Sequence, residues 1–223
     1  KAYLAWFFGV VGQLNLAPLI AGRWKSWVKS QSSYKGPQQA WASAASAMPA
    51  PSSSTNKADK PFGVNLYGFA YGELGIGEDL RMAVECCEAA GIAYYVVNVD
   101  AGDARQADLH LKGKVSDGTE LPPYNTNLFC LPAFDTVSRV FMQKGAAVFE
   151  GYRNIGWWPW ELAVFPKAWK PYAFELVDEV WASSTFLEDM YKRSTDKPVH
   201  LVPLAVSVDR IKRRSEEHTS ELQ

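Results

Sequence analysis

The chain has 223 residues, of which 48% are hydrophobic and 13% aromatic, and a formal net charge of −1. This composition can bury one large or two small cores, so it excludes an intrinsically disordered chain. The near-zero charge provides no basic excess for a phosphate backbone, and we expect no nucleic-acid partner. The three cysteines, Cys86, Cys87 and Cys130, form neither a disulfide framework nor a C-x-x-C metal pattern, which favours reduced thiols and a cytoplasmic location.

The first 29 residues are mostly apolar and lack the pattern of a secretory signal. Residues 3–21 approach the length of a membrane span, but Gln13, Asn15 and Pro18 interrupt them. Three interpretations stay open: a spanning helix, a helix lying in the membrane surface, and the last helix of a preceding domain, which we favour. Peripheral contact with the inner face of the membrane therefore stays open as well.

Residues 30–60 are rich in Ser, Ala, Gln and Pro, show no sustained apolar period and predict a flexible linker. Strand and helix patterns then alternate over residues 61–209. The expected strands are residues 63–70, 93–99, 127–131, 154–158, 179–183 and 199–206. The expected helices are residues 78–90, 136–144, 167–176 and 185–193. This alternation predicts an α/β domain with a doubly wound, Rossmann-like parallel sheet, in which ligands bind at the carboxyl ends of the strands.

The most informative stretch is the opening unit of this domain. An apolar run at residues 63–70 leads into a glycine cluster, Gly72, Gly75 and Gly77, before helical periodicity begins at Glu78. Glycines at such a turn let the backbone approach a ligand, and a helix start can hold phosphate. The order G-x-x-G-x-G matches neither the dinucleotide fingerprint nor the P-loop. The turn therefore either contacts a ligand or simply makes a tight joint.

A second candidate site lies in residues 153–166, RNIGWWPWELAVFP. Tryptophans and a carboxylate follow a predicted parallel strand there, and Trp faces are good platforms for sugar rings. We expect Glu161 to face the resulting cleft. The alternative is that Trp157 and Trp160 belong to the core and that Glu161 only caps the next helix.

Four stretches in succession, GVNLYGFAYGELGIGEDLR, NIGWWPWELAVFPKAW, DEVWASSTFLEDMY and PVHLVPLAV, resemble the amino-terminal half of the retaining glycosyltransferases of family 4 (group 1), which have the GT-B fold. The resemblance covers residues 62–208. It implies two Rossmann-like domains, the first binding the acceptor and the second the nucleotide-sugar, with the reaction in the cleft between them.

The reaction implied by the resemblance moves a sugar from a nucleotide-sugar to a hydroxyl of a glycan or lipid-linked acceptor with retained configuration, as in polysaccharide biosynthesis. It implies no metal and no cofactor besides the nucleotide-sugar. It also assigns roles on the carboxyl rim of the sheet. The loop that faces the donor diphosphate is Gly72, Glu73, Gly75 and Gly77, the catalytic residue is Glu161, and the acceptor-binding residues are Trp158, Trp160 and Glu78.

Two other functions stay open. The first is an NAD-type oxidoreductase domain, which would use Asp100, at the end of the second predicted strand, to bind the ribose. The second is a sugar-binding module without catalysis. The glycine order and the tryptophan-rich stretch favour the glycosyltransferase.

The last ten residues, RSEEHTSELQ (residues 214–223), match the translation of a common sequencing adapter, and we exclude them from fold reasoning as one excludes a tag. The resemblance implies that residues 210–213 begin the connection to a carboxyl-terminal domain that binds the donor. We expect the chain without that domain to be inactive.

Overall fold

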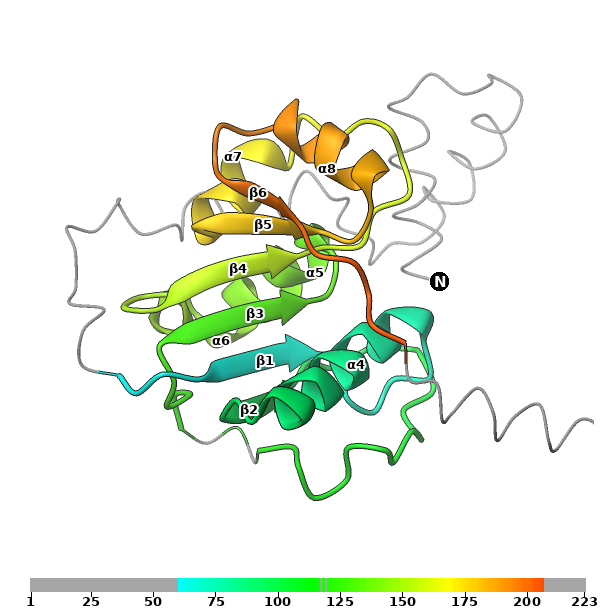
Figure 1. The fold of residues 1–223 in the computed structure, drawn as a ribbon, viewed down its shortest axis with the longest axis vertical. Coiled ribbons are helices and arrows are strands. Elements are labelled where there is room, and N and C mark those ends of the chain that lie inside the picture. Colours follow the sequence, from blue (N-terminus) through cyan, green and yellow to red (C-terminus); the bar gives the residue numbers. More distant parts are fainter. Residues whose placement is uncertain (1–59, 117, 119, 207–223) are drawn as a thin grey trace, which may run out of the picture.

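The computed structural model describes residues 60–206 except residues 117 and 119 (Figure 1). The apolar segment of residues 1–29, the linker up to residue 59 and the tail of residues 214–223 lie outside the described residues. No helix of the described part combines the length and the apolar character needed to cross a membrane.

Six parallel strands form one sheet in the order β2-β1-β3-β4-β5-β6 (Figure 1). They are β1 (Val64–Gly68), β2 (Tyr94–Asn98), β3 (Thr126–Cys130), β4 (Arg153–Trp157), β5 (Glu179–Ala182) and β6 (Val199–Leu201). All five strand pairs are parallel. This confirms the α/β class with a parallel sheet that the alternating pattern predicted.

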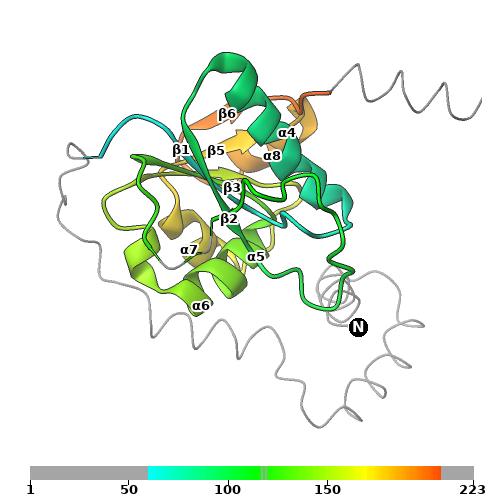
Figure 2. The same cartoon turned by 90° about the horizontal axis from the view of Figure 1, so that it is seen from below.

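The direction of winding changes between β1 and β3, and right-handed connections therefore place helices on both faces of the sheet. The long helix α4 (Gly75–Ala90) connects β1 to β2 on one face. The shorter helices α5, α6 and α7 lie on the other (Figure 2). The helices after β3 are α5 (Ala133–Asp135), the π-helix η2 (Thr136–Phe141), α6 (Met142–Lys144), η3 (Ala146–Val148), α7 (Lys170–Ala173), η4 (Phe174–Leu176) and α8 (Thr185–Lys192).

Strand side chains alternate between two apolar cores, as the period of a pleated strand requires. Leu66, Leu128 and Ile155 pack with the buried side of α4. That side consists of Leu80, Ala83, Val84 and Cys87, which recur at the i, i+3, i+4 and i+7 spacing of one helix face. Tyr67 and Phe129 point to the opposite, larger core, which α8 also joins.

A ladder of three buried asparagines, Asn65, Asn127 and Asn154, crosses neighbouring strands in register. The Nδ2 of Asn65 donates to the Oδ1 of Asn127 at 2.8 Å, and the Nδ2 of Asn127 donates to the Oδ1 of Asn154 at 2.9 Å. The Asn65 and Asn127 amides also donate to the backbone oxygens of Tyr124 and Val148. The ladder thereby ties the segments that lead into β3 and β4 to the sheet.

Several element boundaries differ from those expected, and two of these differences bear on the carboxyl ends of the strands. The helix α4 begins at Gly75 instead of Glu78, so Gly75 and Gly77 are helical. The last strand β6 ends at Leu201 instead of Val206, because Pro203 has no N–H with which to extend the ladder.

His200 lies exposed on β6, which is an edge strand of the sheet. Residues 202–206 run from β6 along the carboxyl ends of the strands toward α4 (Figure 1). The indole Nε1 of Trp157 holds the start of this segment by donating to the backbone oxygen of Val202 at 3.1 Å.

The two glycines in the first turn of α4 offer a matched test of how closely this helix packs against the turn after β1. A Cβ at Gly77 would lie 2.6 Å from the backbone oxygen of Gly72 and 2.9 Å from that of Phe69, whereas a Cβ at Gly75 would meet nothing within 4 Å. We expect Gly77→Ala to lower the free energy of unfolding by about 1–3 kcal/mol through overpacking. Gly75→Ala should leave it unchanged or raise it by up to about 1 kcal/mol. Urea unfolding of both variants measures the difference, and equal effects would contradict the close contact.

Candidate functional site

The carboxyl ends of β1 and β3 lie side by side, with Gly68 paired to Cys130. From this point the chain turns into α4 on one face and into α5 on the other. In doubly wound sheets the crevice at such a switch point is where ligands bind. The candidate site is therefore the carboxyl rim around β1 and β3, and it extends to the end of β4.

The glycine-rich turn after β1 is held mainly by packing against itself. The backbone N–H of Gly72 donates to the oxygen of Phe69 at 3.2 Å, and the first turn of α4 approaches both of these residues at Gly77. Gly72 and Gly77 are buried, whereas Glu73 and Gly75 are exposed. Of the predicted diphosphate loop, only Glu73 and Gly75 are therefore accessible to a ligand. Gly77 has no side chain because the backbone of the preceding turn occupies that space.

The two glutamates predicted on this rim each have a basic partner. The Oε2 of Glu73 lies 3.1 Å from the Nε of Arg105, and the backbone N–H of Glu73 donates to the oxygen of Arg105 at 2.9 Å. The Oε2 of Glu78 accepts a hydrogen bond from the Nε of Arg81 at 2.7 Å. Glu73 thereby joins the glycine turn to the loop after β2, and Glu78 remains 42% exposed at its side chain.

Arg81 is a structural residue of the rim that the sequence pattern did not reveal. Its side chain is only 4% exposed. Besides Glu78, its Nη1 contacts the backbone oxygen of Gly72 at 3.4 Å and the Oδ2 of Asp108 at 3.3 Å. One buried guanidinium thus connects the helix, the glycine turn and the loop after β2.

Asp79 is a candidate functional residue that sequence reasoning missed. Burial and, to a smaller extent, the neighbouring Glu78 raise the pKa of its carboxyl to about 6, and Arg81 opposes this shift. Burial also raises the pKa of the Cys130 thiol, and the Asp79 charge contributes to that increase. The only sequence signal was an acidic pair in the first turns of the helix.

The two predicted sugar platforms lie in different environments. Trp158 is 1% exposed, stacks on Phe165, and donates its Nε1 proton to the Oγ1 of Thr136 at 3.1 Å. Its ring faces are inside the core, which corrects its prediction as an acceptor-binding residue. Trp160 is half-buried, and its Nε1 donates to the oxygen of Val164 at 3.1 Å.

Glu161 is exposed in the loop after β4. Within the described part of the chain, its carboxylate makes no ion pair or hydrogen bond. β3 separates β4 from β1, and neighbouring strands lie about 4.8 Å apart, so the two loops start roughly 10 Å from each other on one rim. The start of this loop is held to the core at Trp158, because the backbone oxygen of Trp158 accepts a hydrogen bond from the Tyr191 hydroxyl at 2.9 Å.

A cation reaches the same rim from the π-helix η2. The Nε of Arg139 donates to the Oδ1 of Asp135 at 2.6 Å, and its Nη1 donates to the backbone oxygen of Asp100 at 2.6 Å. Its guanidinium also lies 5.8 Å from the ring centre of Phe69. π-helical turns are frequent at functional sites. Arg139 therefore places positive charge beside the turn after β1.

The rim offers an anion the amino terminus of α4, where Leu74 provides no side-chain cap. The guanidinium of Arg139 lies on the same rim and is paired with the Asp135 carboxylate. Among residues 60–206, apart from 117 and 119, no three His, Cys, Asp or Glu side chains are grouped so that they could hold a metal ion. Neither the protein-family models nor the curated proteins give a match to this chain.

The raised pKa of Asp79 predicts a pH dependence of stability. Because the native state binds this proton more tightly than the unfolded chain, the free energy of unfolding falls as pH rises from about 4 to about 6. We expect Asp79→Asn to remove this fall and, after allowance for partial exposure, to stabilise the protein at pH 7.5 by about 1–2 kcal/mol.

Urea unfolding at pH 4.5 and 7.5 tests this expectation. The matched control is Asp103→Asn, which changes an exposed aspartate in the loop after β2 and should have little effect at either pH. A loss of stability in Asp79→Asn at pH 7.5 would show that the ionised carboxylate is favoured by the fold.

Proposed function

We propose that residues 60–206 form the acceptor-side domain of a retaining glycosyltransferase of the GT-B type. The sequence resemblance supports this assignment, and so does a parallel sheet whose switch point carries the uncapped start of a long helix. The observation that carries the proposal is the exposed Glu161, which lies on the same rim and has no partner in the described part of the chain.

In this proposal the rim orients the acceptor and lowers the cost of charge on the leaving group. Glu161 accepts a hydrogen bond from the acceptor hydroxyl and holds its oxygen toward the anomeric carbon. That oxygen attacks the anomeric carbon from the face that the diphosphate leaves, so that the configuration is retained. The bond from the anomeric carbon to the diphosphate breaks, and the hydroxyl proton passes to the departing diphosphate oxygen. The α4 dipole and Arg139 stabilise the negative charge that develops on the diphosphate.

Buried aromatic residues give the loop of Glu161 a fixed position in this proposal. Trp158, Phe165 and Tyr191 pack under the loop, with the Trp158 and Phe165 rings 6.4 Å apart. Trp158 is therefore a positioning residue. The half-buried Trp160 is the indole on this loop that retains exposed surface for an acceptor sugar. A lipid-linked acceptor would place the domain at the inner face of the membrane.

One observation favours a second candidate, the NAD-type domain. Asp100 is exposed two residues after the end of β2, where a ribose-binding acid belongs. The backbone N–H of Gly102 and the Nε2 of Gln106 donate to its Oδ1, and these hydrogen bonds hold the pKa of its carboxyl below the usual range. Against this candidate, a dinucleotide needs glycines open to its pyrophosphate, and Gly72 and Gly77 are buried.

Glu161→Gln tests the proposal directly. The full chain is titrated with a panel of methyl hexosides and with NAD, and affinity is measured by calorimetry. We expect Glu161→Gln to weaken the binding of the best glycoside about tenfold, because a hydrogen bond to a charged group is worth roughly 1.5–3 kcal/mol. Its melting temperature should stay unchanged, since the side chain is exposed.

Glu175→Gln is the matched control, because this glutamate is also exposed but belongs to η4. It should bind glycosides as the unchanged chain does. Equal affinity in both variants would remove Glu161 from the site. Saturable binding of NAD without glycoside binding would replace the proposal by the oxidoreductase. If an intact homologue binds glycosides at this rim but turns over no nucleotide-sugar, the domain is a sugar-binding module without catalysis.

A further inference from the structure

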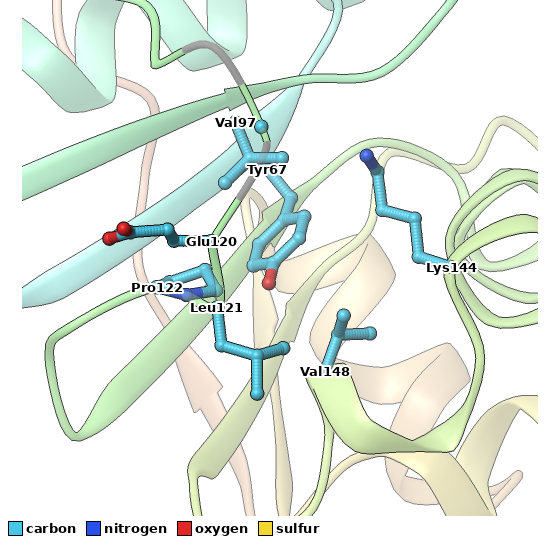
Figure 3. A pocket seen from close by; sticks show the side chains of 8 residues that line it. Tyr67, Val97, Glu120, Leu121, Pro122, Lys144 and Val148 are labelled. Atoms are coloured by element: carbon cyan, nitrogen blue, oxygen red, sulfur yellow. The ribbon is translucent and has the colours of Figure 1, made fainter.

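A pocket of about 250 Å³ lies on the face of the sheet opposite α4 (Figure 3). Apolar side chains line much of it, including Val97 from β2, Leu121 and Val148. The segments that contain Leu121 and Val148 lead into the amino ends of β3 and β4. Tyr67 and Val97 lie one residue before the carboxyl ends of β1 and β2, and the pocket extends from them toward the amino ends of β3 and β4. Its volume is below the roughly 300–1,000 Å³ of pockets for drug-sized ligands.

Tyr67 of β1 brings an unsatisfied hydroxyl to this pocket. The residue is 0% exposed, and its ring packs 4.9 Å from that of Phe129. In the described part of the chain its hydroxyl has no hydrogen-bond partner, and Figure 3 shows it between Leu121 and Val148. Burial raises the pKa of Tyr67 well above its usual value, so the hydroxyl keeps its proton and can donate it.

Two other buried tyrosines show how such hydroxyls are normally satisfied. Tyr152 donates to the backbone oxygen of Pro122 at 2.8 Å, and Tyr191 donates to that of Trp158 at 2.9 Å. A buried hydroxyl without a partner costs free energy and is rare in native proteins, so each one calls for an explanation such as strain, a catalytic role or a bound water or ion. In the described part of the chain the hydroxyls of Tyr67, Ser116 and Ser138 are buried without a partner, and of these three residues Tyr67 lines the pocket.

Lys144, the last residue of α6, lines the pocket from a different wall (Figure 3). Its ammonium group forms no ion pair among the described residues. Glu120 also borders the pocket, but its carboxylate points away from Tyr67 (Figure 3). The lining therefore presents a hydroxyl donor and a cation on separate walls, with apolar side chains between them.

We propose that this pocket binds a small aromatic carboxylate that also carries a hydrogen-bond acceptor at the end away from its carboxylate. The carboxylate pairs with Lys144, the acceptor receives the Tyr67 hydroxyl proton, and the ring contacts Val97 and Val148. 4-Hydroxybenzoate has this arrangement and serves as the probe. Benzoate lacks the acceptor, and 4-hydroxybenzamide lacks the charge.

The test compares these three compounds on the full chain and on single variants, with affinities from chemical-shift titrations. The unchanged chain should bind 4-hydroxybenzoate about fivefold more tightly than either analogue. Tyr67→Phe should remove the preference over benzoate, and Lys144→Gln should remove the preference over 4-hydroxybenzamide. Lys112→Gln is the control, because this exposed lysine adjoins Leu111, which packs on the α4 side of the sheet.

Melting curves separate binding from folding, since Tyr67→Phe removes only a buried unsatisfied hydroxyl and should melt at or above the unchanged chain. Absence of saturable 4-hydroxybenzoate binding in the unchanged chain would overturn the proposal. So would a crystal structure grown with the probe in which only a water molecule contacts the Tyr67 hydroxyl. Preferences that survive both substitutions would overturn it as well.

Discussion

The close contact between α4 and the turn after β1 is the constraint on which the carboxyl rim depends. Gly77 lies against the backbone oxygens of Phe69 and Gly72, where a Cβ would come within 2.6 Å of the nearer one. This contact lets the helix begin seven residues after Gly68, the last residue of β1. The positive end of the helix dipole is therefore fixed beside the switch point, where an anionic ligand of a doubly wound sheet binds.

Burial gives the rim its remaining chemistry. Arg81 is paired and almost fully buried, and it holds the turn in place. Asp79 is partly buried near the same groups, and burial moves its pKa to about 6. The aromatic core beneath the β4 loop includes Trp158, so Glu161 is presented from a packed base although its own side chain is exposed. Buried residues that support the rim, such as Trp158, thus lie within a few positions of exposed residues such as Glu161.

The sequence predicted features that depend on local period, and it missed those that depend on contacts between distant residues. Alternating apolar strands and helices predicted the parallel sheet, because buried strands and amphipathic helices have different spacings. The role of Gly77 could not be predicted, since a glycine leaves room equally well for a ligand or for the protein's own backbone. Trp158 has its partner Thr136 22 residues away in the chain. The orphan hydroxyl of Tyr67 likewise appears only once the strands are in register.

Mapping the bound sugar on the protein tests the proposed acceptor site most directly. In a titration of the full chain with the tightest-binding methyl hexoside, backbone amide chemical shifts report which residues approach the ligand. The proposed function predicts that the largest changes fall in residues 70–79 and 158–164, on either side of β3. Changes confined to the amino ends of the strands, or to the loop of Asp100 alone, would contradict it.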